Sequence, residues 1–223
     1  MAISSLKNYT YTATLLIALG AAVGLVGCSD KPITKEFRDN FDRKELGAGY
    51  LDTIGRWAVY RNRLNVSHAY NHPLWLKRRL PRNVEIELDA TAYTPDGDIK
   101  VILYGDGRSF EDHRGAYKST GYVLCLGAWK NTKSFITRQL EHPPHGRERE
   151  FMASRTDFRI KVGQTYHFRI VRKGQEIRWD IDGKPFLSFV DRRPLWGKGH
   201  DHFGFANWES EVAFDNLVIR PLK

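Results

Sequence analysis

Residues 166–191 constrain the fold more than any other stretch, because hydrophobic residues recur there at every second position. Tyr166, Phe168 and Ile170 share one side of such a pattern, which is typical of half-buried antiparallel strands. Lys173-Gly174 and Asp182-Gly183 fall where the chain must reverse, since glycine accepts a positive φ. The stretch predicts a three-stranded meander over residues 166–172, 176–181 and 185–190.

Short strand patterns separated by turns also fill the region before this meander, without internal repeats. The predicted strands cover residues 57–60, 63–66, 74–76, 83–91, 99–104, 120–129 and 134–140. No segment has the apolar spacing of a long helix. Many short strands at this spacing predict an all-β fold, a two-sheet antiparallel β-sandwich.

The N-terminal residues have the pattern of a targeting segment. An apolar run over residues 13–26 follows Lys7, and it is shorter than the ~20 residues of a membrane-spanning helix. Leu25-Val26-Gly27-Cys28 then resembles the lipobox of bacterial lipoproteins, in which the cysteine is lipidated and the chain is cut before it. The alternative is an ordinary signal peptide that contains a cysteine.

The lipobox resemblance implies a lipoprotein signal peptide over residues 1–27. It also implies diacylglycerol and palmitate on Cys28, and attachment to the outer membrane of a bacterial cell envelope. Residues 28–35 are then predicted to be a lipidated tether, and residues 36–223 to be the sandwich domain, enough chain for one domain with its own core.

Composition narrows the choice of partners. The chain has a formal charge of +9, and a basic exported protein is expected to favour acidic partners such as uronate-containing polysaccharides. Lys and Arg are scattered among Asp and Glu, which together with export argues against nucleic acid. With Cys28 lipidated, Cys125 has no partner for a disulfide, and its apolar neighbours predict a buried side chain rather than a nucleophile.

Several motifs resemble the concanavalin A-like lectin/glucanase superfamily. They are Phe37-Arg-Asp-Asn-Phe-Asp42, the strand at Trp57, the turn at Ile181-Asp-Gly183 and the closing segment from Gly204 to Ile219. The layout from Gly121 to Ile219 is similar to the YesU-like family of jelly rolls. The resemblance implies two curved sheets, the concave one offering a groove for a glycan, but it does not by itself imply catalysis.

A catalytic strand motif of the glucanases in this superfamily is incomplete here. Glu85, Glu87 and Asp89 share one face of a predicted strand, but Ala92 stands where the last carboxylate of the longer motif would be. Glycoside hydrolysis needs paired carboxylates across the substrate. We therefore expect an ordinary solvated strand face.

The segment from Trp129 to His145 is the stronger candidate for a site. Trp129 and Asn131 end one predicted strand, Arg138, Glu141 and His142 end the next, and a hairpin is expected to bring these ends together. Trp129 can stack on a sugar ring, Asn131 offers a directional polar group, and Arg138 can bind a carboxylate with two hydrogen bonds. Glu141 and His142 are the candidate catalytic pair, suited to proton abstraction in a polysaccharide lyase.

Two further sites are expected near the C-terminus. Asn207 and Trp208 follow a strand and are predicted to reach the same groove, although Trp208 could equally belong to the core. Asp215 is a candidate ligand for a structural calcium, an ion that takes 6 to 8 oxygen ligands. No other cofactor is expected.

The sequence therefore predicts an envelope lipoprotein that binds an acidic polysaccharide on the concave face of a jelly roll, and it favours a binding role over an enzymatic one without deciding between them. A glycoside hydrolase or polysaccharide lyase is the first alternative. A lipoprotein that uses the fold for protein interaction is the second.

Overall fold

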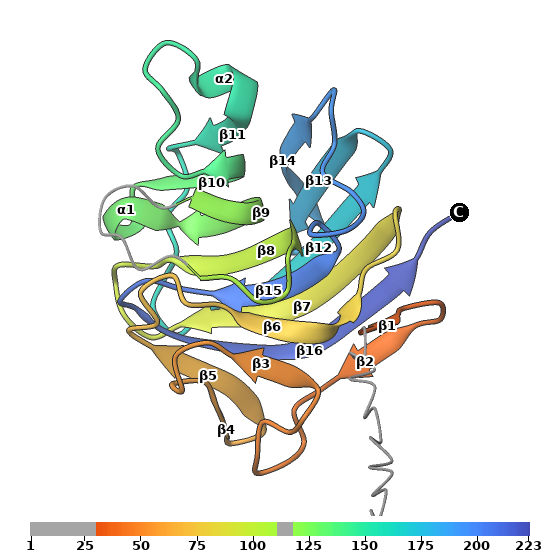
Figure 1. Cartoon of the computed structure of the whole chain (residues 1–223). Coiled ribbons are helices and arrows are strands. Elements are labelled where there is room, and N and C mark those ends of the chain that lie inside the picture. Colours follow the sequence, from red (N-terminus) through yellow and green to blue (C-terminus); the bar gives the residue numbers. More distant parts are fainter. Residues whose placement is uncertain (1–29, 111–117) are drawn as a thin grey trace, which may run out of the picture.

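The computed structural model describes residues 30–110 and 118–223, which form a sandwich of two antiparallel sheets (Figure 1). The predicted signal peptide over residues 1–27 and Cys28 lie outside the described residues. This architecture confirms the predicted all-β jelly roll. Within the described residues, no helix is long and apolar enough to span a membrane.

Sheet A has the strand order β1-β6-β15-β8-β9-β10-β11, with β3 also paired to β6. Its strands are β1 (Lys31–Pro32), β3 (Tyr50–Asp52), β6 (Leu74–Arg79), β8 (Ile99–Gly105), β9 (Lys118–Gly127), β10 (Lys133–Leu140), β11 (Met152–Arg155) and β15 (His202–Ala206). Only the pairing of β1 with β6 is parallel among these strands of the described chain. Two one-turn helical segments flank β10, α1 (Ala128–Asn131) and α2 (Glu148–Phe151).

Sheet B has the order β14-β13-β12-β7-β16-β5-β4, with β2 also paired to β16. Its strands are β2 (Phe37–Asp39), β4 (Ala58–Tyr60), β5 (Arg63–Ser67), β7 (Val84–Ala92), β12 (Thr165–Lys173), β13 (Glu176–Ile181), β14 (Lys184–Val190) and β16 (Glu211–Pro221). The predicted meander is confirmed as β12, β13 and β14, and Gly174 and Gly183 have the positive φ that its two turns require.

The main core lies between the sheets and is built by alternation. In β7, Val84, Ile86 and Leu88 are buried in this core, while Glu85 and Glu87 point the other way. Both glutamates form ion pairs with Arg220, at 3.0 and 2.9 Å. This face is therefore the solvated strand face that the sequence predicted.

Sheet A differs, because its outer face is apolar as well. Trp75, Ile102, Val123 and Phe135 form a second buried cluster there. The loop after β8 lies over this cluster, since Trp75 Nε1 donates a hydrogen bond to the Ser109 carbonyl at 3.0 Å. The groove that the family resemblance implied is therefore not open along the whole sheet. The chain at Ser109 covers the part of this floor around Trp75.

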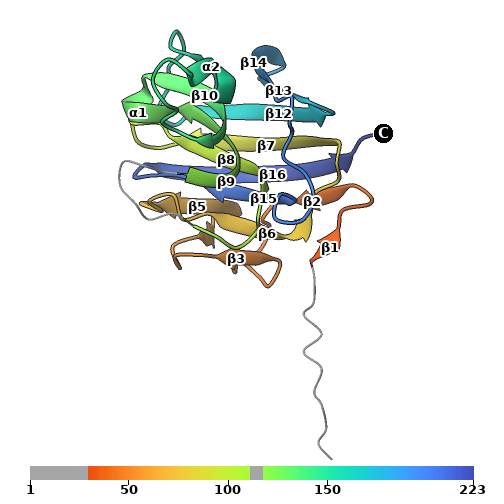
Figure 2. The ribbon, with the colours of Figure 1, turned by 45° about the horizontal axis from the view of Figure 1, so that its top comes forward.

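The fold begins earlier than predicted. Lys31 and Pro32 pair with Arg78 and Arg79 of β6, and Ile33 is only 4% exposed and belongs to the main core. The predicted tether over residues 28–35 is therefore wrong from residue 31 onward. Burying the apolar side chain of Ile33 is favourable in free energy, so the chain at this position packs on the core instead of remaining in solvent. β1, β2 and the C-terminus lie at one end of the sandwich and α1 at the other (Figures 1 and 2).

Candidate functional site

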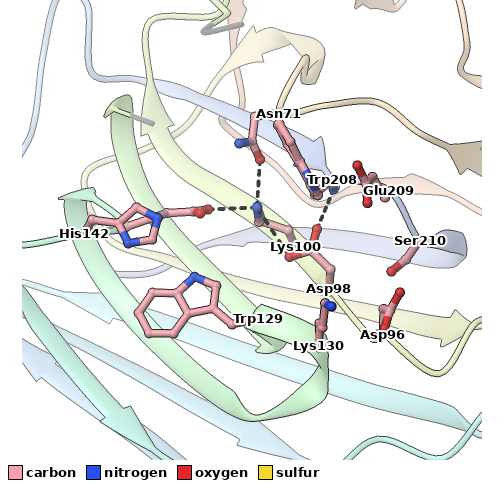
Figure 3. A pocket seen from close by; sticks show the side chains of 11 residues that line it. Asn71, Asp96, Asp98, Lys100, Trp129, Lys130, His142, Trp208, Glu209 and Ser210 are labelled. Carbon is pink, nitrogen blue, oxygen red and sulfur yellow. Dashed lines mark hydrogen bonds and ion pairs between the residues drawn. The ribbon is translucent and has the colours of Figure 1, made fainter. Parts of the chain in front are cut away.

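A cavity of about 260 Å³ opens on the outer face of sheet A, at the end where α1 lies. Its walls come from the turns between β7 and β8 and between β15 and β16, from α1, and from the chain after β10. Figure 3 shows these side chains converging on Lys100. The lining residues are Asn71, Asp96, Asp98, Lys100, Trp129, Lys130, Glu141, His142, Trp208, Glu209 and Ser210.

Lys100 forms the floor of the cavity. It alternates in β8 with Ile99 and Val101, which face the main core, so its side chain points to the outer face. The residue is 1% exposed. Its ammonium lies 2.8 Å from Asn71 Oδ1, 2.8 Å from Glu141 Oε1 and 3.5 Å from Asp98 Oδ1. A buried lysine stays charged only with such partners.

Glu141 reaches Lys100 because the chain reverses after β10. Gln139 has a φ of 65°, and Thr137 Oγ1 lies 2.5 Å from the Leu140 carbonyl oxygen. Glu141 is 6% exposed. Burial raises the pKa of its carboxyl, an effect that the Lys100 ammonium opposes and the Asp98 carboxylate reinforces.

Asp98 connects three segments beneath the cavity. It accepts hydrogen bonds from the Trp208 backbone N–H and, at 3.2 Å, from Cys125 Sγ. Its own N–H donates to the Gly127 carbonyl at 2.9 Å. Burial, with Asp98 close by, raises the pKa of the Cys125 thiol well above its usual value. Cys125 is fully buried, which confirms its predicted structural role.

Trp129 and His142 form one wall. Their rings stack at 5.2 Å with 5° between their planes, and Lys133 Nζ lies 4.7 Å from the centre of the Trp129 ring. Trp129 is 41% exposed, so it is not a core residue. Trp129, Lys130 and Asn131 all have a left-handed φ, between 52° and 58°. Such backbone is uncommon outside glycine and is held here by tertiary contacts.

Trp208 forms another wall, as predicted, and packs edge to face on Tyr70 at 5.1 Å. The prediction for Asn207 is wrong, because Asn207 is completely buried. Its Oδ1 accepts the Ala69 N–H at 3.1 Å and its amide donates to the Ser210 carbonyl. Asn207 therefore ties together the loops that carry Asn71 and Trp208, and it cannot touch a ligand.

Asn131 and Arg138 do not line the cavity either. The Asn131 amide exchanges hydrogen bonds of 3.0 and 2.9 Å with the backbone of Ile160. Arg138 pairs along β10 with Tyr122 and donates to Asp191 Oδ2 at 2.9 Å. Arg138 lies on the inner face of the sheet, where its guanidinium is paired with Asp191 and is not available to bind a uronate.

The hairpin argument that joined these residues was also wrong. Ala128 pairs with Lys133, so Trp129 lies at the turn and Arg138 lies at the far end of β10. His142 reaches Trp129 only through the reversal after β10. The contact between Trp129 and His142 was therefore expected for the wrong reason.

Sequence reasoning missed Lys100, Asp98 and Asn71. The available signal was Lys100 itself, a charged residue within the apolar run of residues 99–104, because lysine is seldom buried without a partner. Asp98 and Asn71 gave no comparable signal, since both lie in turns where polar residues are ordinary.

The proposed calcium ligand Asp215 lies 3.7 Å from Arg63. Burial raises the pKa of its carboxyl. In residues 30–110 and 118–223, no group of three or more His, Cys, Asp or Glu side chains is placed to hold a metal. The lipidation site Cys28 lies outside those ranges.

A family model described as farnesoic acid 0-methyl transferase matches residues 108–217. The match is just under half of the chain. It includes Trp129, Glu141 and Trp208 but not Asn71, Asp98 or Lys100, so it covers only part of the cavity. No curated protein matches the chain in sequence.

Solved structures with the same fold are more numerous. The carbohydrate-binding module CBM66 from Bacillus subtilis is 15% identical, with a TM-score of 0.59 over 78% of this chain and 96% of that one. A laminarinase from Flavobacterium sp. UMI-01 is 10% identical, with a TM-score of 0.57 over 83% and 99%. The alginate lyase Aly36B is 14% identical, with a TM-score of 0.54 over 86% and 98%. The chain thus shares the jelly-roll fold of proteins that bind or process carbohydrates.

Proposed function

We propose that this protein binds a glycan in the cavity between Trp129 and Trp208. The observation that carries the proposal is the composition of that cavity, which combines two tryptophans with a fixed polar floor of Lys100, Glu141 and Asn71. Sugar rings are recognised by aromatic faces together with a few directed polar groups. The carbohydrate-active proteins that share the fold support the same conclusion.

The test is glycan binding by tryptophan variants. Trp129→Ala and Trp208→Ala should each weaken binding by about tenfold, the effect of losing one aromatic contact of roughly 1.4 kcal/mol. Binding can be measured by glycan array followed by calorimetry. Trp196→Ala is the matched control, because Trp196 is 43% exposed but does not line the cavity. An equal loss of glycan affinity in all three variants would contradict the assignment of this cavity as the binding site.

Glycan cleavage is the second candidate function. Asp98 Oδ1 and Glu141 Oε1 contact the same ammonium at 3.5 and 2.8 Å, so the two carboxylates lie close together, and paired carboxylates are the groups that glycoside hydrolases use. Glu141, with its raised pKa, would be the general acid. Release of reducing ends by the wild type, abolished in Glu141→Gln with binding retained, would establish this activity.

The lipid anchor at Cys28 and the outer-membrane location remain part of this proposal, on the strength of Leu25-Val26-Gly27-Cys28 alone. An acidic glycan was expected from the net charge of the chain. Lys100 on the floor of the cavity gives that expectation no support, because its buried ammonium is already bound by protein oxygens.

A further inference from the structure

The charges that line the cavity are unequal. Four carboxylates, those of Asp96, Asp98, Glu141 and Glu209, face only two ammonium groups, those of Lys100 and Lys130. Figure 3 shows Asp96 and Glu209 on one side of Lys100, and Trp129 and His142 on the other. Among these side chains, carboxyl groups therefore outnumber ammonium groups by two.

Lys100 does not present its charge to a ligand. Asn71, Asp98 and Glu141 surround its ammonium, and two carboxylates share this one cation. By contrast, Asp96 and Glu209 are exposed and form no ion pair or side-chain hydrogen bond within the described part of the chain. The charged groups of the lining that are exposed and without an ion pair in the described part of the chain are therefore these two carboxylates and the Lys130 ammonium, so negative charge prevails among them.

The aromatic walls favour the same kind of ligand. The face of a tryptophan ring attracts cations, and Trp129 already holds the Lys133 ammonium 4.7 Å from its ring centre. Trp208 provides a second indole beside Glu209. An indole next to a carboxylate, as Trp208 is to Glu209, is a combination that recognises amines.

We propose that the cavity selects glycans with a positively charged amino group, that is, amino sugars without an N-acetyl group, over neutral sugars and uronates. This inference rests on the proposed glycan-binding function. The cavity volume of about 260 Å³ is below the ~300–1,000 Å³ of sites that enclose drug-sized ligands. It suits a terminal sugar unit better than a long stretch of polysaccharide.

The test compares three oligosaccharides of equal length by calorimetry: one of glucosamine, its N-acetylated form and an oligogalacturonate. The glucosamine oligomer should bind best, and Asp96→Asn and Glu209→Gln should each weaken it by about fivefold, the upper range for an exposed ion pair. Glu176→Gln, on β13 of the other sheet, should leave binding unchanged.

The outcomes separate the inference from the function on which it rests. Equal or tighter binding of the N-acetylated or uronate oligomer, still lost in Trp208→Ala, would overturn the amine preference and leave the glycan site in place. Binding of none of the three would count against both the preference and the proposed function. Insensitivity of glucosamine binding to Asp96→Asn and Glu209→Gln would also overturn the preference.

Discussion

The buried cluster of Lys100, Glu141 and Asp98 costs free energy that an apolar floor would not cost. Moving charged groups out of water carries a penalty that mutual attraction often fails to recover. Neighbouring positions on the same face, such as Ile102 and Val123, show that apolar residues fit there. The cluster is therefore best explained by its place in the cavity rather than by stability.

Glu141 should make the stability of the protein pH-dependent. Because burial raises its folded pKa above the ordinary value of 4.5, the folded state holds more protons than the unfolded state between these two pKa values. Wild-type stability should therefore fall relative to Glu141→Gln as pH rises through this window. Melting temperatures of both proteins from pH 4 upward, taken as a difference, measure the effect.

Asp39 provides a control of opposite sign. Burial opposes its ionisation, but hydrogen bonds from Arg43, Tyr50 and the Phe41 N–H prevail and lower its pKa below 3.8. The stability of the wild type relative to Asp39→Asn should therefore increase as pH rises through the acidic range toward 3.8. The difference in melting temperature between the wild type and Glu141→Gln could prove independent of pH while that for Asp39→Asn changes. That result would show that Lys100 keeps Glu141 ionised throughout.

At the scale of elements, the cavity depends on a short segment with an unusual backbone. Residues Trp129 to Asn131 are left-handed, and each such residue costs about 1 kcal/mol or more. Two hydrogen bonds between Asn131 and Ile160 hold the segment from outside. Without them we expect Trp129 to lose its fixed position.

Asn131→Ala should therefore lower both stability and glycan affinity. The Ile160 N–H and carbonyl would each lose a partner, at a cost of about 1–3 kcal/mol, or roughly 3–10 °C in melting temperature for a domain of this size. Asn131→Asp keeps the acceptor of the Ile160 N–H and should show a smaller loss. Trp129→Ala, at an exposed position, should leave the melting temperature nearly unchanged. A large drop in the melting temperature of Trp129→Ala, with no drop for Asn131→Ala, would show that Trp129 rather than Asn131 stabilises the segment.

At the scale of the whole molecule, the N-terminal strand and the cavity lie at opposite ends of the sandwich. β1 lies at the end opposite α1 (Figure 2), and Asp30 is already fixed, since its carbonyl accepts a hydrogen bond from Arg79 Nε at 2.9 Å. If Cys28 carries lipid, little chain separates the bilayer from the fold. The cavity then faces away from the membrane, toward ligands in the surrounding space.

Cys28→Ser should yield a precursor that takes up no labelled fatty acid and keeps its N-terminal segment, which mass spectrometry of membrane fractions would show. The reason is chemical, because the acyl chains need a thiol at that position. Cys125→Ser is the matched control and should be labelled normally, since the Cys125 thiol is fully buried. Undiminished labelling of Cys28→Ser would disprove the anchor.

The sequence by itself determined the sandwich and most of its strands, but not β1, β3 or β11. Alternation in β7 and in the meander of β12, β13 and β14 is local information, because a strand with one buried face must repeat every two residues. The same alternation showed that Glu85, Glu87 and Asp89 form a solvated face. The tether was misjudged because the pairing of β1 with β6 joins residues far apart in the chain.

Tertiary structure decided the polar floor of the site, while Trp129, Glu141, His142 and Trp208 in its lining were already candidates from the sequence. Asp98 and Lys100 lie two residues apart at the start of β8, but Glu141 comes from the reversal after β10, and no sequence spacing relates it to them. Asn131, Arg138 and Asn207 looked like ligand contacts because they are polar at strand ends, yet each is used by the backbone or by another side chain. Which polar groups stay available depends on partners distant in sequence, and only the folded chain brings those partners together.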